Sequence, residues 1–231
     1  MKIQFGILLA LFALCRAAQA QGFINLDFDS ANISGYSPGP IPTQDAFPYW
    51  SAYYGPLSDP TYSGNVSVVA YDGISLGGAV ISLVDPNAPA PYGPIQGNYS
   101  ALLQGSNPTA GTAASIGQTG TIPSTAQSLI FWGNVAANFQ VSFDGQMLSL
   151  VDVNNAMNYT VYGANCSAFA GQTGQLLFTA PVETFDLIDN IQFSSSSVPE
   201  PNILCLAAFT GAAFGWRRWR RCRRFSQPPG M

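Results

Sequence analysis

The residues able to do chemistry in the long middle of this 231-residue chain are carboxylates and aromatic rings. The chain has no histidine, and all eight of its lysines and arginines lie before Ala17 or after Trp216. A Ser-His-Asp or Cys-His catalytic device and a histidine metal ligand are therefore excluded. Eleven of the twelve acidic residues lie between Asp27 and Asp189. A region with no cation to contact phosphate is not expected to bind nucleic acid or anionic lipid.

Glycoside hydrolysis is a reaction that carboxylates alone can carry out, because it needs only two of them. The candidate catalytic residues are Asp144, Glu183, Asp186 and Asp189. Between residues 21 and 197 the chain offers a single glutamate and no lysine or arginine to clamp a substrate. We therefore expect a non-enzymatic protein, and a small glycosidase or lyase is the least favoured of three hypotheses.

Aromatic side chains offer a second kind of chemistry, which is stacking on the C–H faces of sugar rings. Phe47, Tyr49, Trp50, Tyr53 and Tyr54 fall within eight residues of a proline-rich stretch. An exposed loop would present Trp50, Tyr53 and Tyr54 to a polysaccharide. The alternative is that these rings close one end of the core, since large aromatic residues are usually buried.

The carboxylates could also hold a hard divalent cation, for which calcium fits better than zinc because only oxygen ligands are present. Asp27 and Asp29 precede the other acidic residues, and Asp189 is the last before the chain's C-terminal segment. If the first and last strands lie together, these three could bind a structural calcium ion. The alternative is that Asp27 and Asp29 form the solvated face of a first strand. No other cofactor is expected.

The elements that would position these residues are short strands. Alternation of apolar and polar residues predicts a first strand over 23–29 and a clear hairpin, in which Asp144-Gly145 joins two β-patterned runs. Residues 32–60 contain six prolines, which lack the donor for a sheet ladder, so this irregular region is expected to be loop or edge strand and not central sheet. Trp132 lies within a strand pattern and is expected in the core. About ten strands without a long helical period predict a single all-β domain, a β-sandwich of jelly-roll type.

The C-terminal segment differs in composition from the rest of the chain. Four serines at 194–197 precede Val198, Pro199, Glu200 and Pro201, and an apolar run follows to Trp216. A run of this length is just sufficient for a membrane-spanning helix. The cluster of arginines after it predicts that the tail stays in the cytoplasm and the rest of the chain outside; its members are Arg217, Arg218, Arg220, Arg221, Arg223 and Arg224.

This order of serine spacer, Pro-Glu-Pro, hydrophobic helix and arginine cluster resembles the PEP-CTERM sorting signal of bacterial exported proteins. The resemblance covers about the last 38 residues. It implies a transient anchor in the inner membrane and cleavage near Pro199-Glu200-Pro201 by an exosortase-type membrane protease. Short stretches such as Asp189-Asn190-Ile191 are similar to the last strand of galactose-binding-like jelly rolls. That similarity implies a galactose-binding-like sandwich.

At the N-terminus, an apolar run ends in Ala18-Gln19-Ala20, which is typical of a secretory signal peptide. The predicted organisation is a signal peptide at 1–20, an ectodomain at 21–193, a serine linker at 194–197, the sorting signal at 198–224 and a tail at 225–231. The sequence therefore predicts an exported cell-surface or extracellular-matrix protein. A carbohydrate-binding module of the exopolysaccharide matrix is the alternative, and the two hypotheses are compatible.

Overall fold

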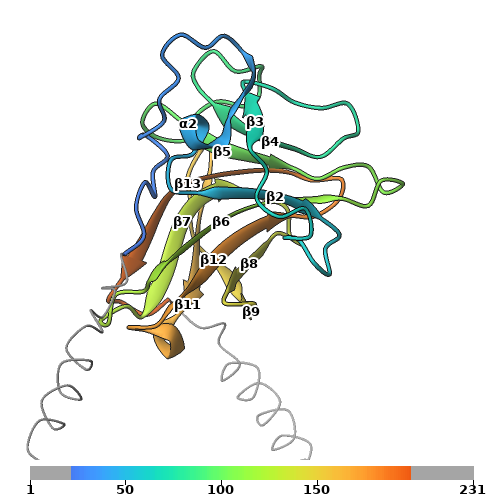
Figure 1. The fold of residues 1–231 in the computed structure, drawn as a ribbon. Coiled ribbons are helices and arrows are strands. Elements are labelled where there is room, and N and C mark those ends of the chain that lie inside the picture. Colours follow the sequence, from blue (N-terminus) through green and yellow to red (C-terminus); the bar gives the residue numbers. More distant parts are fainter. Residues whose placement is uncertain (1–21, 199–231) are drawn as a thin grey trace, which may run out of the picture. The chain divides into compact units, whose positions relative to one another are not determined.

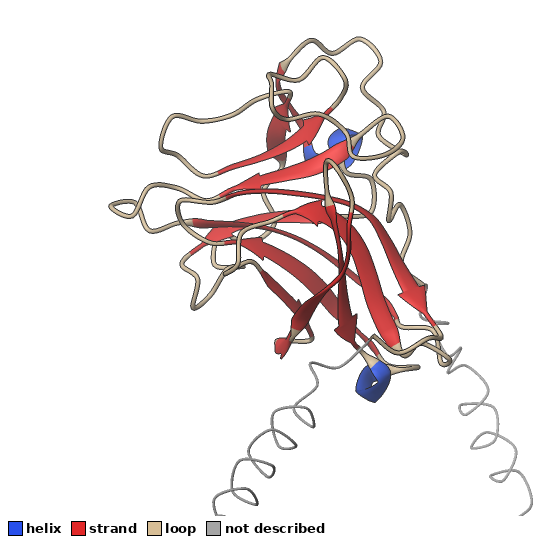
Figure 2. Ribbon diagram, turned by 180° about the vertical axis from the view of Figure 1, so that it is seen from behind, coloured by secondary structure: helices blue, strands red, loops and turns tan. Residues whose placement is uncertain are grey.

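A computed structural model of the chain describes residues 22–198. These residues form two β-sheets packed face to face, with very little helix (Figures 1 and 2). The prediction of an all-β, two-sheet domain is confirmed. Within this part of the chain no helix is long and apolar enough to cross a membrane. The predicted signal peptide and most of the predicted sorting signal lie outside the described residues.

The larger sheet has eight strands, and all neighbouring pairs are antiparallel except β3 and β4. Its spatial order is β1 (Gly39–Pro42), β3 (Val68–Tyr71), β4 (Val80–Val84), β5 (Ser100–Gln104), β13 (Phe185–Ser194), β7 (Ser128–Asn134), β11 (Thr160–Asn165) and β10 (Leu150–Asn155). The last strand along the chain, β13, thus lies in the middle of the sheet.

The smaller sheet has five antiparallel strands in the order β2 (Ser51–Gly55), β6 (Ala113–Thr121), β12 (Thr173–Ala180), β8 (Gln140–Phe143) and β9 (Gln146–Leu148). Two short helical turns complete the described structure, α2 (Thr43–Ala46) and the 3₁₀ turn η2 (Ser167–Phe169). The chain crosses from β9 directly into β10, so one continuous segment closes one side of the sandwich.

The core lies between the two sheets and is built by alternation, because successive side chains of a strand point to opposite faces. On β12, Leu176 and Phe178 point inward and are fully buried. Trp50, which precedes β2, is also fully buried. Its ring packs against Phe28 and Phe178, and its indole Nε1 donates a hydrogen bond of 2.9 Å to the carbonyl oxygen of Asn25.

One local prediction was wrong, and two were confirmed. Residues 23–29 form turns instead of a first strand, because Asn25 and Phe28 have φ angles of 52° and 58°. The proline-rich segment 32–60 is loop and edge strand as predicted, because its strands β1 and β2 each lie at the edge of a sheet, with α2 between them. The Asp144-Gly145 hairpin between β8 and β9 is present, with φ angles of 48° and 76° at the turn.

Because Trp50 joins the N-terminal turns to the smaller sheet within the core, its removal should destabilise the whole domain. Trp50→Ala leaves a cavity and an unpaired carbonyl at Asn25, so we expect the free energy of unfolding to fall by about 3–5 kcal/mol. Denaturant unfolding followed by circular dichroism measures this loss. Tyr62→Ala is the matched control, since Tyr62 is 77% exposed and should change stability by about 0.5 kcal/mol or less. Equal effects of the two variants would contradict this account of the core.

Candidate functional site

Trp50 is not available as a sugar-binding residue, because none of its surface is exposed. The sequence could not separate a loop that presents aromatic rings from one that buries them. The hydroxyl of Tyr54 accepts a hydrogen bond from the backbone N–H of Ile81, so this ring also faces inward. Tyr53 points to the outer face of the smaller sheet, where its hydroxyl accepts a 3.1 Å hydrogen bond from Gln175 Nε2.

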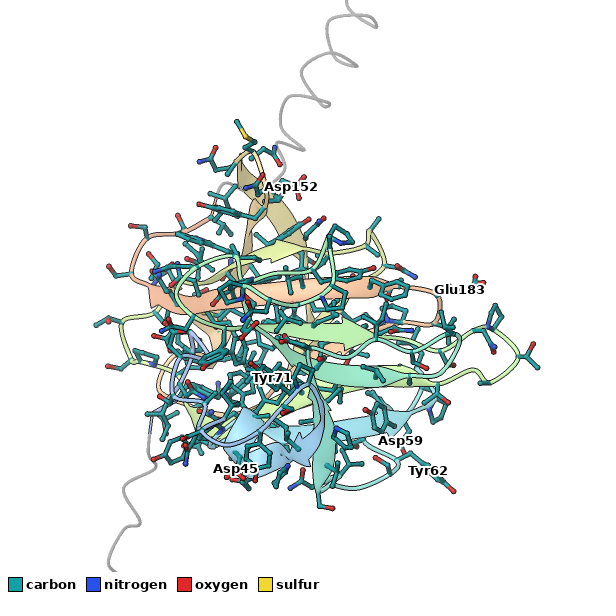
Figure 3. All side chains as sticks on the ribbon, turned by 90° about the horizontal axis from the view of Figure 1, so that it is seen from above. Asp45, Asp59, Tyr62, Tyr71, Asp152 and Glu183 are labelled. Atoms are coloured by element: carbon teal, nitrogen blue, oxygen red, sulfur yellow. The ribbon has the colours of Figure 1, made fainter. Side chains whose placement is uncertain are left out.

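The four candidate catalytic carboxylates are not brought together. Asp144 is exposed in the β8–β9 turn, and Glu183 is exposed in the loop before β13. Figure 3 places Glu183 at the edge of the molecule. Asp186 and Asp189 are three residues apart on β13, so their side chains point to opposite faces of the sheet. No pair among them faces a common cleft, which is what a glycosidase would require.

The three predicted calcium ligands are occupied by hydrogen bonds. Asp29 Oδ1 accepts the backbone N–H groups of Asn98 and Tyr99 at 2.7 and 3.1 Å. Asp189 Oδ2 accepts from Gln96 N at 3.0 Å and Ser100 Oγ at 2.7 Å. Asp27 accepts from the N–H of Asp29. Within residues 22–198, no three acidic or cysteine side chains lie close enough to hold a metal ion, so this set does not fit calcium.

Instead, Asp29 and Asp189 clamp the loop that runs from β4 to β5. They hold its last residues, 96–100, from two sides. Gly97 allows the close approach, because its φ is +65° and an added Cβ would overlap the Asp29 carboxylate. The earlier part of the loop lies over the outer face of the larger sheet, where Tyr92 and Ile95 pack against Leu102 and Leu187.

This clamped loop forms one wall of a groove, which we call the aromatic groove. Its volume is about 440 Å³, within the range of about 300–1,000 Å³ found for ligand sites. Pro91, Pro94 and Ile95 line one side, and the turn 156–159 between β10 and β11 lines the other. Leu187 of β13 and Asn134 of β7 complete the lining.

The second wall is rigid because two aromatic rings stack there. Tyr159 lies on Trp132 with ring centroids 4.6 Å apart and an interplanar angle of only 12°. The turn beneath is closed by a 2.9 Å hydrogen bond from Ala156 N to the carbonyl of Tyr159. Met157 at the tip of the turn is almost completely exposed. On the other side, beyond Pro91, Tyr92 stacks on Phe185 at 5.6 Å.

The side chains that line the aromatic groove carry no charge. None of its lining residues is ionisable except Tyr159, a phenol. The side-chain amides of Asn134 and Asn158 are exposed and make no hydrogen bond within residues 22–198, so both can serve a ligand. A flat ring beside unpaired amides matches a ligand with apolar C–H faces and many hydroxyl groups. Carbohydrate has this character, whereas a charged ligand would find no counter-charge.

The sequence missed this groove because Trp132 was assigned to the core. On β7, both alternating sets are apolar, since Leu129 and Phe131 face inward while Ile130 and Trp132 face outward. Alternation therefore could not decide which set is buried. The strand register would have located the groove, because it pairs Trp132 with Val161, two residues after Tyr159. Strand register cannot be read from a single sequence.

A separate buried cluster lies at the ends of β3 and β4. Tyr71 donates a 2.7 Å hydrogen bond to Asp85 Oδ2, and Asp85 N donates to Asp72 Oδ1. Asp72 Oδ2 is buried without a hydrogen-bond partner. Burial raises the pKa of Asp72 to about 6, and the nearby charge of Asp85 adds to this. Burial opposes ionisation of Asp85 as well, but hydrogen bonds from Tyr71 and Asn87 bring its pKa below the usual value.

Comparisons with known proteins do not assign the chain to a family. Neither a protein-family model nor a curated protein matches the sequence. Solved structures are similar only loosely. A carbohydrate-binding module, TmCBM61 in complex with β-1,4-galactotriose, is 12% identical with a TM-score of 0.38, over 75% of this chain and 97% of that one.

Two further structures show the same level of similarity. The Stig cyclase Fisc from Fischerella sp. TAU is 14% identical with a TM-score of 0.41, over 78% of this chain and 98% of that one. The enzymatically active domain of bacteriophage CBA120 tailspike protein 4 is 14% identical with a TM-score of 0.40. The match covers 76% of this chain but only 21% of the tailspike chain. Likeness at this level carries no argument about ligand or activity.

The buried carboxyls make stability depend on pH in an unusual direction. Burial raises the pKa values of Asp72, Asp186 and Asp189 from 3.8 to about 6. Between about pH 4 and 6 the folded chain therefore keeps protons that the unfolded chain has released, and the free energy of unfolding falls as pH rises. We expect a higher thermal midpoint at pH 4.5 than at pH 7.5, with Asp186 and Asp189 each contributing on the order of 1–3 kcal/mol.

Asp72→Asn tests the origin of this effect. Asparagine tolerates the φ of +50° at this position and places an N–H donor toward Asp85, as the protonated acid would. The variant should melt higher than the wild type at pH 7.5 and show a flatter pH profile. Asp59→Asn, at an exposed position, should leave the profile unchanged. A lower midpoint for Asp72→Asn at pH 7.5 would show that the buried carboxylate is not strained.

Proposed function

We propose that this chain is an exported, non-catalytic protein of the cell surface or extracellular matrix, and that its ectodomain binds neutral polysaccharide in the aromatic groove. The observation that carries the proposal is the stacked Trp132–Tyr159 pair, which presents a rigid ring beside unpaired amides in a groove without charge. A rigid ring loses little conformational entropy when it binds, so its contact area is available for affinity.

The absence of a carboxylate pair supports binding without turnover. The aromatic groove contains no acidic residue. Another groove, beside the β9–β10 segment near Leu148 and Tyr162, contains Asp152 as its one acidic residue. Hydrolysis of a glycosidic bond needs an acid and a second carboxylate across the scissile bond, and neither groove supplies both. The architecture that we propose for this binding domain is a jelly-roll-like, galactose-binding-like sandwich.

The location of the protein follows from its two ends. A signal peptide at 1–20 directs export, and the PEP-CTERM-like segment 198–224 holds the precursor in the inner membrane. An exosortase-type protease then cleaves near Pro199-Glu200-Pro201, the motif that resembles the PEP-CTERM signal. The released ectodomain reaches the cell surface or the exopolysaccharide matrix, where a neutral groove meets a polysaccharide ligand.

Affinity electrophoresis through gels containing single polysaccharides tests the groove. We expect retardation by at least one neutral polysaccharide among β-1,4-galactan, dextran, β-glucan and mannan, and none by the anionic polymers alginate and polygalacturonate. Tyr159→Ala and Trp132→Ala should weaken binding tenfold or more, which corresponds to about 1.4 kcal/mol. These rings lie on the outer face of the sheet, so the variants should remain folded.

Tyr62→Ala is the control for this experiment, because Tyr62 is an exposed tyrosine that does not line the groove. It should bind as the wild type does. Retardation that both groove substitutions leave unchanged, or a wild-type protein that no neutral polysaccharide retards, would refute the proposed site.

Sorting is tested independently by the intact mass of the protein isolated from its native cells. We expect loss of all residues after the 198–201 region, with the shortened chain outside the membrane fraction. No lysine or arginine lies between Ala17 and Trp216, so an acid-specific protease is needed to map the new end. A membrane-bound chain that retains its arginine tail would show that the segment is a permanent anchor.

A further inference from the structure

The outer face of the smaller sheet holds a second neutral groove, on the side of the sandwich opposite the aromatic groove. We call it the amide groove. Its volume is about 270 Å³, and strands β8 and β12 form its floor. The loop after β2 lines one side through Leu57 and Pro60, and Met147 of β9 lines the other. Leu57 and Met147 are exposed, with accessible fractions of 39% and 58%.

A row of hydrogen-bonding groups crosses the smaller sheet and reaches this groove at Thr179 and Gln140. The strand register places Tyr53, Ser115, Thr179 and Gln140 in line across β2, β6, β12 and β8. Ser115 Oγ donates to Thr179 Oγ1 at 2.9 Å, and both residues are buried. Four residues before Thr179 on β12, Gln175 Nε2 donates a 3.1 Å hydrogen bond to the Tyr53 hydroxyl.

Not all of this hydrogen-bonding capacity is used. The side chains of Gln140 and Ser142 line the groove and make no hydrogen bond within residues 22–198. Gln175 uses Nε2 on Tyr53 and keeps its Oε1 for another partner. The groove therefore offers amide donors, amide acceptors and a hydroxyl, with apolar side chains at its rim and no ionisable group in its lining.

We infer that the amide groove is a second binding site for a neutral polysaccharide segment, and that the domain is bivalent. This inference rests on the proposed function, because it assigns the same class of ligand to a different face. The two grooves lie on outward faces of different sheets, so one molecule can hold two polysaccharide chains at once. Such a protein cross-links a polysaccharide network, and the linkage gains strength from simultaneous engagement.

The test compares binding with cross-linking, using the full-length chain kept soluble by a polyoxyethylene detergent, which carries no sugar. The probe is whichever of β-1,4-galactan, dextran, β-glucan and mannan retards the wild type in affinity gels. Cross-linking is followed by dynamic light scattering of that polysaccharide as protein is added. The wild type should increase the particle size severalfold.

Two variants separate the grooves. Gln140→Ala with Ser142→Ala removes the unpaired groups of the amide groove, and Trp132→Ala with Tyr159→Ala removes the aromatic wall. Each double variant should still bind, with retardation reduced about tenfold, and neither should increase the particle size. A protein carrying all four substitutions should not bind at all.

The possible failures are distinguishable. If the Gln140/Ser142 variant still cross-links as the wild type does, the amide groove is not a site, and the inference is wrong. If the Trp132/Tyr159 variant alone loses all binding, the aromatic groove is the single site. The proposed function is then supported, and the inference of bivalence is wrong. If the Gln140/Ser142 variant alone loses all binding, the amide groove is the single site, and both the aromatic site and bivalence are refuted. If no neutral polysaccharide retards the wild type, the proposed function fails together with the inference.

Discussion

Every buried carboxylate of this domain must be satisfied without a cation from the protein, because residues 22–198 contain no lysine, arginine or histidine. Burying an ionised group is costly unless hydrogen bonds or an opposite charge compensate it. The chain uses backbone N–H groups and hydroxyls for this purpose. Buried Asp189 holds Gln96 and Ser100 in this way, assisted by the partly exposed Asp29, and Asp186 accepts a 2.6 Å hydrogen bond from Ala136 N. Asp72 is the exception, because its buried Oδ2 accepts no hydrogen bond within residues 22–198.

The same constraint determines what the surface can recognise. A domain without cations has no counter-charge for an anionic ligand, and the linings of the aromatic groove and the amide groove contain no carboxylate for a cationic one. What remains is shape, aromatic stacking and neutral hydrogen bonding. The carboxylate clamps act indirectly, because they hold the 85–99 loop against the larger sheet and so form the wall opposite Tyr159. The acidic residues therefore position the groove while staying out of it.

Much of the fold was predictable because short-range chemistry specifies it. The Asp144-Gly145 turn needs positive φ at two adjacent positions, and few other sequences provide it. The first strand was wrong because alternation in 23–29 also suits a series of turns that buries Phe28. Asp29 and Asp189 both bind the loop before β5, which is close to the expectation that the two ends of the domain meet. Their partners, however, are backbone N–H groups and the Ser100 hydroxyl, and not a calcium ion. Trp132 and Tyr159 could not be paired from sequence, since their contact depends on the register between β7 and β11.

We propose that Trp132 supports the ligand site by stacking on Tyr159, whereas Trp50 belongs to the core. Residues 22–198 contain these two tryptophans, so their indole N–H resonances report on the two places separately. The most direct measurement is a titration of the ¹⁵N-labelled protein with a neutral oligosaccharide from a polysaccharide that retards it, followed by NMR. The account predicts that the Trp132 indole resonance shifts progressively to saturation while that of Trp50, hydrogen-bonded to Asn25, stays in place. A titration that moves neither resonance, or moves Trp50 alone, would contradict it.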